Sequence, residues 1–105
     1  LHKATERMIE LANGKEPENE LEYRALNQAA RELLMAQTSC WEFIMFTGTM
    51  VGYAHKKISD HVQRLFKIYE DFKNGKLDEE WIKEIEYRDN IFPEIEYRMY
   101  RTSWL

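Results

Sequence analysis

One stretch of the chain carries a long and regular apolar repeat. Between residues 51 and 72, apolar side chains and one histidine recur at alternating steps of three and four: Val51, Ala54, Ile58, His61, Leu65, Ile68 and Phe72. That spacing places all of them on one face of a helix. Such a stripe is buried when other helices pack against it, so the repeat predicts a helical bundle.

Three other segments indicate how the rest of the bundle is built. Residues 1–13 carry apolar side chains at helical spacing and end at an Asn-Gly pair. A second helix is predicted over about 17–38, and a shorter fourth helix follows the N-cap residue Asp78. Residues 91–100 are apolar at intervals but contain Pro93, which disfavours helix at the residue before it.

The predicted fold is therefore all-α, a helical bundle of three long helices plus short helices and an irregular C-terminal tail. The tail is expected to pack across the bundle or across a partner. A length of 105 residues suggests a single domain, 1–105. The chain begins inside a helical pattern and ends without terminal punctuation, so we expect a piece of a longer protein.

Charge and cysteine content limit the partners and the compartment. The net charge is −4, and the lysines and arginines are scattered, each close to an acid. Nucleic-acid binding needs clustered positive charge, so no nucleic-acid partner is expected. No apolar run approaches the ~18 residues of a membrane-spanning helix, so no membrane partner is expected either. The single cysteine, Cys40, excludes an internal disulfide and favours a reducing, cytoplasmic location.

The sequence offers little catalytic or metal-binding chemistry. Cys40 has no nearby histidine in the sequence that could activate it. His55 and His61 are six residues apart, whereas two helical ligands of one metal need a spacing of three or four. No catalytic residue, metal or cofactor is therefore predicted. His61 lies on the apolar stripe and is expected to be a buried neutral histidine, hydrogen-bonded to a neighbouring helix.

A dense aromatic cluster follows the predicted end of the second helix. We expect a break after Gln37 and a new short turn, in which Trp41, Phe43 and Phe46 precede a Thr-Gly-Thr sequence at 47–49. The two phenylalanines are expected in the core, since they carry no polar group. Trp41 either fills the core or lies at a rim, where loops present side chains for binding.

Four motifs follow one another in a specific order: LHKATERM at 1–8, NQAARELLMAQ at 27–37, Ser-x-Trp-x-Phe-Ile-Met-x-Thr-Gly-Thr at 39–49 and DNIFPEIEYR at 89–98. In this order they resemble the C-terminal helical region of glycoside hydrolase family 57 α-glucan branching enzymes, which were often first labelled α-amylases. The family pattern has Ser-Asp-Trp, often followed by proline. Here Cys40 and Glu42 stand at the Asp and Pro positions.

The resemblance implies a domain without its own catalysis. In the family, the glutamate nucleophile and the aspartate acid/base lie in an N-terminal (β/α)7 barrel, outside these residues. The chain would then be excised from the C-terminal part of a larger glycoside hydrolase, and the catalytic barrel and α-glucan would be its partners. Expected substrate-binding residues are Trp41, Ser39, Thr47 and Gly48. The alternatives are a purely structural interaction module with no ligand contact and an independent helical adaptor.

Overall fold

The computed structural model describes residues 2–46, 52–89, 92 and 94–100, and in His2, 40–46 and 52–55 it describes the backbone alone. The described residues form α1 (His2–Asn13), α2 (Glu20–Phe46), α3 (Gly52–Asn74), α4 (Glu79–Arg88) and the short 3₁₀ helix η1 (Tyr97–Tyr100). They contain no strand, so the prediction of an all-α fold is confirmed. None of the described helices is both long and apolar enough to cross a bilayer.

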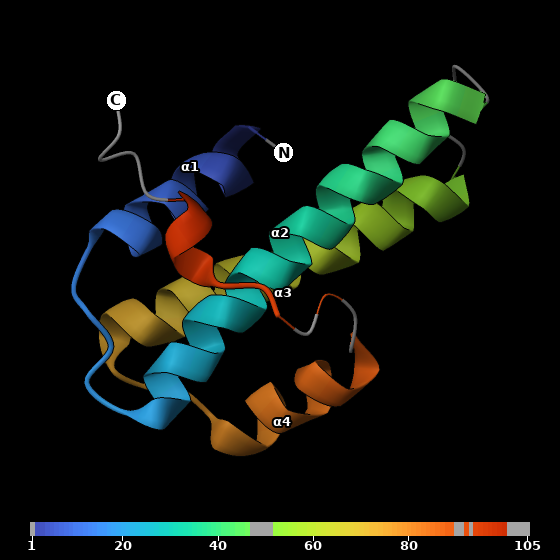
Figure 1. The fold of residues 1–105 in the computed structure, drawn as a ribbon. Coiled ribbons are helices and arrows are strands. Elements are labelled where there is room, and N and C mark those ends of the chain that lie inside the picture. The colour runs from blue at the N-terminus through green and yellow to red at the C-terminus, as the bar shows by residue number, and fades with distance from the viewer. Residues whose placement is uncertain (1, 47–51, 90–91, 93, 101–105) are drawn as a thin grey trace.

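Helices α2 and α3 form a long antiparallel hairpin that organises the molecule (Figure 1). The N-terminal half of α2 and the C-terminal half of α3 are surrounded by α1, α4 and η1 (Figure 1). The other half of the hairpin extends away from these elements. We call this extended half the hairpin end, and its described residues all belong to α2 or α3.

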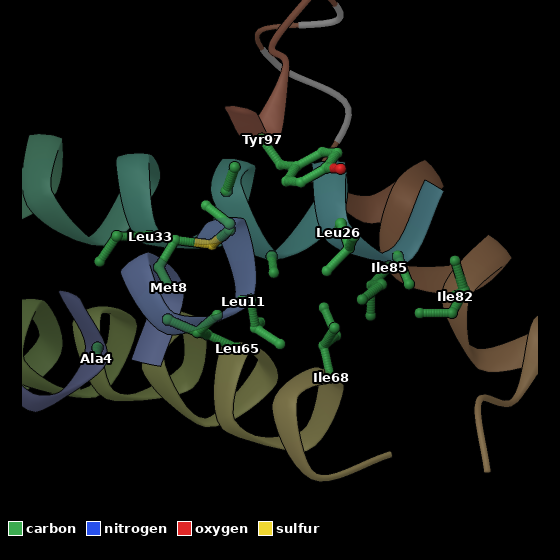
Figure 2. Packing of buried hydrophobic residues seen from close by; sticks show 14 residues of the cluster. Ala4, Met8, Leu11, Leu26, Leu33, Leu65, Ile68, Ile82, Ile85 and Tyr97 are labelled. Carbon is green, nitrogen blue, oxygen red and sulfur yellow. The ribbon is translucent and has the colours of Figure 1, made fainter. Parts of the chain in front are cut away.

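The hydrophobic core lies between the hairpin and the elements around it (Figure 2). Its fully buried members come from every helix: Ala4, Met8, Leu11, Ala12, Ala25, Leu26, Ala29, Ala30, Leu33, Leu65, Ile68, Ile82, Ile85 and Tyr97. The alanines of α2 are small enough to let neighbouring helices approach closely. The predicted apolar faces of all four helices thus contribute to one core, as the periodicity indicated.

The predicted break after Gln37 is wrong, because α2 continues to Phe46. The segment contains no glycine or proline, so nothing in it blocks the helical backbone. Thr38 and Ser39 have only a weak preference against helix, which packing along α3 can outweigh. The predicted short turn is absent, and Trp41 lies within the helical backbone of α2.

Side-chain caps fix the start of two helices. The α2 helix begins at Glu20 rather than at Pro17, and Asn19 Oδ1 accepts a hydrogen bond from Glu22 N at 2.9 Å. The N-cap role of Asp78 is confirmed. Its Oδ1 accepts hydrogen bonds from the backbone N–H groups of Glu80 and Trp81, at 3.0 and 3.3 Å.

The C-terminal tail packs across the bundle, which is one of the two placements that the sequence left open. Tyr97 is fully buried, and its backbone N–H donates to Asn27 Oδ1 at 2.9 Å. Before this contact the chain turns at Phe92, whose φ of 52° lies in the left-handed region that few bulky residues adopt. Arg31 Nε lies 3.4 Å from the carbonyl oxygen of Phe92 and ties the turn to α2.

Candidate functional site

Two of the four predicted substrate-binding residues, Ser39 and Trp41, lie in the second half of α2. Ser39 lies on α2 and is half-buried, and Trp41 follows it in the same helix. The side chain of Trp41, together with Thr47 and Gly48, lies outside the described residues. Because α2 is continuous, positions 39 and 41 are about 200° apart around the helix axis and do not share a face.

A second group of polar residues lies inside the bundle, where α2, α3 and the end of α4 meet. Glu32, His61 and Asp89 are 0, 3 and 7% exposed. His61 Nδ1 is 2.7 Å from Glu32 Oε1 and 3.7 Å from Asp89 Oδ2. The prediction that His61 is buried and hydrogen-bonded to a neighbouring helix is therefore confirmed. Its neutral state remains a prediction.

These three side chains have the chemistry of metal ligands. Each offers one donor atom, and the three atoms lie within 4.8 Å of one another. However, Arg64 Nη1 is 3.0 Å from Asp89 Oδ2, 3.4 Å from His61 Nδ1 and 3.8 Å from Glu32 Oε1. The guanidinium group thus fills the space that a cation would need. The residues present fit a closed ion-pair network better than a metal centre.

A further layer of hydrogen bonds holds Glu32 in place. Gln28 Nε2 donates to Glu32 Oε2 at 2.8 Å and approaches the carbonyl oxygen of Ile85 at 3.3 Å. Arg31 Nη1 in turn donates to Gln28 Oε1. No buried side-chain nitrogen or oxygen among the described residues lacks a hydrogen-bond partner. The network therefore satisfies its polar atoms and links α2 to α4.

Burial governs the ionisation of Glu32. Removal from water raises the pKa of the Glu32 carboxyl above its ordinary value of 4.5, and the adjacent carboxylate of Asp89 raises it further. The hydrogen bonds from His61 and Gln28 act in the opposite direction. The raised pKa shows that the desolvation of Glu32 outweighs its favourable contacts.

Sequence reasoning missed Glu32 and Asp89 as members of this network. Glu32 lies in a charged, helix-favouring stretch and Asp89 directly follows α4, so both resembled solvated residues. The available signal was His61, because a histidine on an apolar stripe needs polar partners on neighbouring helices. The spacing within the sequence did not identify those partners.

A groove runs along the surface above this network, between α3 and α4. It consists of two hollows of about 250 and 460 Å³. Asp60, Arg64 and Arg88 line both hollows, so the two are continuous. His61 and Asp89 also line the first hollow, so the groove opens onto the buried network.

Comparisons with known proteins agree with this architecture. Residues 1–100 match the family described as 1,4-alpha-glucan branching enzyme, C-terminal. A 1,4-alpha-glucan branching enzyme of Thermococcus kodakarensis is 30% identical over 96 residues, which make up 88% of this chain and 14% of that protein. The crystal structure of the α-amylase AmyC from Thermotoga maritima superimposes with a TM-score of 0.81 and 41% identity, over 94% of this chain and 19% of the amylase.

The chain thus spans less than a fifth of the length of either relative. The match covers all four α-helices and η1, including the hairpin, the buried network and the packed tail. The family match over residues 1–100 covers far more than half of the 105 residues. The chain belongs to the family formed by the C-terminal domains of 1,4-alpha-glucan branching enzymes.

Proposed function

We propose that this chain is the non-catalytic C-terminal domain of a larger enzyme that acts on α-glucan. In this proposal the domain packs against a catalytic barrel of the same protein and helps to shape its glucan-binding cleft. The name of the Thermococcus relative supports the substrate class, and the small share of both relatives that the chain covers supports a larger parent. The single Cys40 favours a cytoplasmic location for that parent.

The observation that carries the proposal is the extended half of the hairpin (Figure 1). The last buried residue described on α2 is Ala36, and α1, α4 and η1 all lie toward the other half. A helical pair that extends beyond its own core offers a surface to another part of the protein. Ser39 and the backbone of Trp41 lie in this half of α2, so a barrel that packs there would place them beside its cleft.

Trp41 is the residue to which we assign the main glucan contact. It lies one helical turn after Thr38, on the same face of α2, and Thr38 is exposed. An indole offers an apolar ring face to a sugar and an N–H group to a hydroxyl. Ser39 and Thr47 would add hydroxyl contacts, and Gly48 would allow close approach of the backbone.

The resemblance to family 57 suggests the chemistry that the domain would assist. A retaining enzyme cleaves an α-1,4 bond through a covalent glycosyl-enzyme, which then reacts with water or with another acceptor. Branching requires a glucan 6-hydroxyl as the acceptor, so water must be excluded from the cleft. We assign Trp41 to the wall that positions the acceptor chain.

The test is the Trp41→Ala substitution in the enzyme that contains this domain. We expect a lower ratio of branching to hydrolysis, because water would enter the space left by the indole. Tyr87→Ala is the matched control, since Tyr87 is an aromatic residue of α4 that is 87% exposed and far from the hairpin end in sequence. An unchanged ratio in Trp41→Ala would refute the role of Trp41.

The second candidate function is a purely structural module that stabilises the barrel without touching glucan. Exposed apolar side chains favour this alternative, since Met99 is 58% exposed and Phe92 is 36% exposed. It predicts self-association of the 105-residue chain, which sedimentation velocity would detect. It also predicts that Trp41→Ala destabilises the whole enzyme but leaves the ratio of products unchanged.

A further inference from the structure

The groove between α3 and α4 contains many charged groups, but most of them are already paired. Four of its cations each lie within 3.0 Å of a carboxylate: Lys56 with Asp60, Arg64 with Asp89, Lys67 with Asp71 and Arg88 with Glu84. Lys57 is the remaining cation that lines the groove. Paired charges give little net attraction for a free anion.

Ion-paired side chains nevertheless offer many hydrogen-bonding positions. Arginine and lysine donate hydrogen bonds, and the carboxylate of Asp60 accepts them. A sugar hydroxyl both donates and accepts, so a surface that alternates donors and acceptors at low net charge suits a neutral polyhydroxyl ligand. Gln63 adds an amide with both capacities to the second hollow.

The second hollow also has an aromatic wall. Trp81, in the first turn of α4, lines it and is half-buried. Lys67 Nζ lies over the indole ring, 4.7 Å from its centroid, so a cation–π contact occupies that face and a ligand that stacks there must displace the lysine. A binding site that combines an apolar wall with a few convergent polar groups has the usual make-up of a small-molecule site.

The floor of the groove is built before any ligand binds. His61 and Asp89 line the first hollow, and they are only 3 and 7% exposed. Arg64 is held at this floor by Asp89 at 3.0 Å. These side chains fix the floor of the groove, whereas Gln63 and Arg88, which offer hydrogen bonds along its sides, are exposed.

We propose that the groove between α3 and α4 is a second binding site for α-glucan, separate from the hairpin end. The ligand class rests on the proposed function, but the site does not, since it shares no residue with Ser39, Trp41, Thr47 and Gly48. The occupant is a neutral segment of α-1,4-linked glucose. Its hydroxyls would contact Asp60, Gln63 and Arg88, and its apolar face would replace Lys67 over the Trp81 ring.

The test is an NMR titration of the 105-residue chain with maltoheptaose. The Trp81 indole N–H and the Gln63 side-chain amide report on the groove, and the Trp41 indole N–H reports on the hairpin end. We expect saturable shifts at Trp81 and Gln63 in the wild-type chain. The double variant Gln63→Ala, Arg88→Ala removes two hydrogen-bonding side chains and should weaken binding at Trp81 about tenfold.

The matched control is Glu84→Ala. It breaks the same ion pair with Arg88, at 3.0 Å, but Glu84 lines neither hollow of the groove. This variant should bind maltoheptaose at Trp81 as the wild type does. Equal weakening in Glu84→Ala and in the double variant would overturn the groove proposal, because the effect would then come from the lost ion pair.

Two further outcomes separate this proposal from the function assigned above. Shifts at Trp41 with none at Trp81 would overturn the groove and leave the hairpin end as the glucan contact. Shifts at Trp81 with none at Trp41 would support the groove and count against the hairpin end. Inorganic phosphate is the ligand control, and shifts at Trp81 with phosphate but not with maltoheptaose would also overturn the groove proposal.

Discussion

At the scale of single residues, Arg64 determines what the buried carboxylates can hold. Its Nη1 lies between Asp89, His61 and Glu32, at 3.0, 3.4 and 3.8 Å from their nearest donor or acceptor atoms. A guanidinium at this place neutralises charge that would otherwise be buried without a partner. Removal of one member of a buried ion pair is costly for the same reason.

Substitution of Arg64 should therefore change both stability and metal binding. Arg64→Ala is expected to lower the free energy of unfolding by about 3 kcal/mol, because Glu32 and Asp89 lose their cation. It should also open the space among the three ligand atoms to Zn²⁺. At a Zn²⁺ concentration a hundredfold above Kd, the variant should regain about 2.7 kcal/mol. Chemical denaturation with and without Zn²⁺ measures both effects.

Two controls accompany this prediction. The double variant His61→Ala, Arg64→Ala lacks one ligand and should gain little from Zn²⁺. Arg88→Ala removes an arginine from an exposed ion pair, whose side chains are 56 and 61% exposed, and should cost less than about 1 kcal/mol. Equal stabilisation of the wild type and Arg64→Ala by Zn²⁺ would show that Arg64 does not block the site.

The pH dependence of stability should distinguish two glutamates. The pKa of Glu32 is raised above 4.5 in the folded chain, mainly by burial. Its contribution to stability is thus present below pH 4.5 and is lost as the pH rises through its folded pKa. Glu32→Gln removes this loss, so its stability relative to the wild type should increase as the pH rises from 4.5 through the folded pKa of Glu32 and then level off.

Glu10 should show the opposite dependence of stability on pH. Hydrogen bonds from Tyr69 and Lys73 lower its pKa below 4.5, so its contribution is present above pH 4.5 and is lost as the pH falls. Glu10→Gln should therefore lose stability relative to the wild type at neutral pH, and this difference should shrink in acid. Denaturation curves between about pH 3 and pH 7 span both windows. If the stability of both variants relative to the wild type changes with pH in the same direction, the opposite pKa shifts of Glu32 and Glu10 are contradicted.

At the scale of helices, the sequence predicted where the helices lie and which faces are apolar better than it predicted where α2 ends. The N-cap Asp78 and the described parts of the apolar faces were correct because they depend on local chemistry and on periodicity, whereas the side chains of Val51 and Ala54 lie outside the described residues. The end of α2 was not, because Thr38 and Ser39 can cap a new turn or remain inside a helix. Which of these occurs depends on packing along α3, and local sequence does not contain that information.

The cap of α4 makes a prediction at this scale. Asp78 Oδ1 accepts hydrogen bonds from Glu80 N and Trp81 N, so Asp78→Ala should lower the free energy of unfolding by about 0.5–2 kcal/mol. Asp78→Asn is the control, since its amide oxygen can accept the same bonds. Thermal or chemical denaturation compares the two. An equal loss in both variants would mean that charge rather than capping stabilises α4.

At the scale of the whole molecule, the C-terminal tail packs on the bundle and completes its core. The sequence left open whether residues 91–100 pack on the bundle or on a partner, because their apolar spacing fits either surface. The structure buries Tyr97 in the core and connects its backbone N–H to Asn27. The buried network is likewise a property of the whole fold, since Glu32, His61 and Asp89 come from distant parts of the sequence.

Removal of the buried ring should test how much the tail contributes. Tyr97→Ala is expected to cost about 3–5 kcal/mol, because it empties a fully buried aromatic position. Tyr97→Phe keeps the ring but loses the hydroxyl, which lies 3.3 Å from Glu16 Oε2, so it should cost about 1 kcal/mol. If Tyr97→Ala is as stable as the exposed-site variant Tyr87→Ala, the tail does not help to hold the bundle together.

We propose that the hairpin end contacts α-glucan through Trp41. The most direct measurement is the shift of the Trp41 indole N–H when the 105-residue chain is titrated with maltoheptaose, with cellohexaose as the β-linked control. We expect a saturable shift with the α-linked sugar and none with the β-linked one. No shift with maltoheptaose, or equal shifts with both sugars, would contradict it.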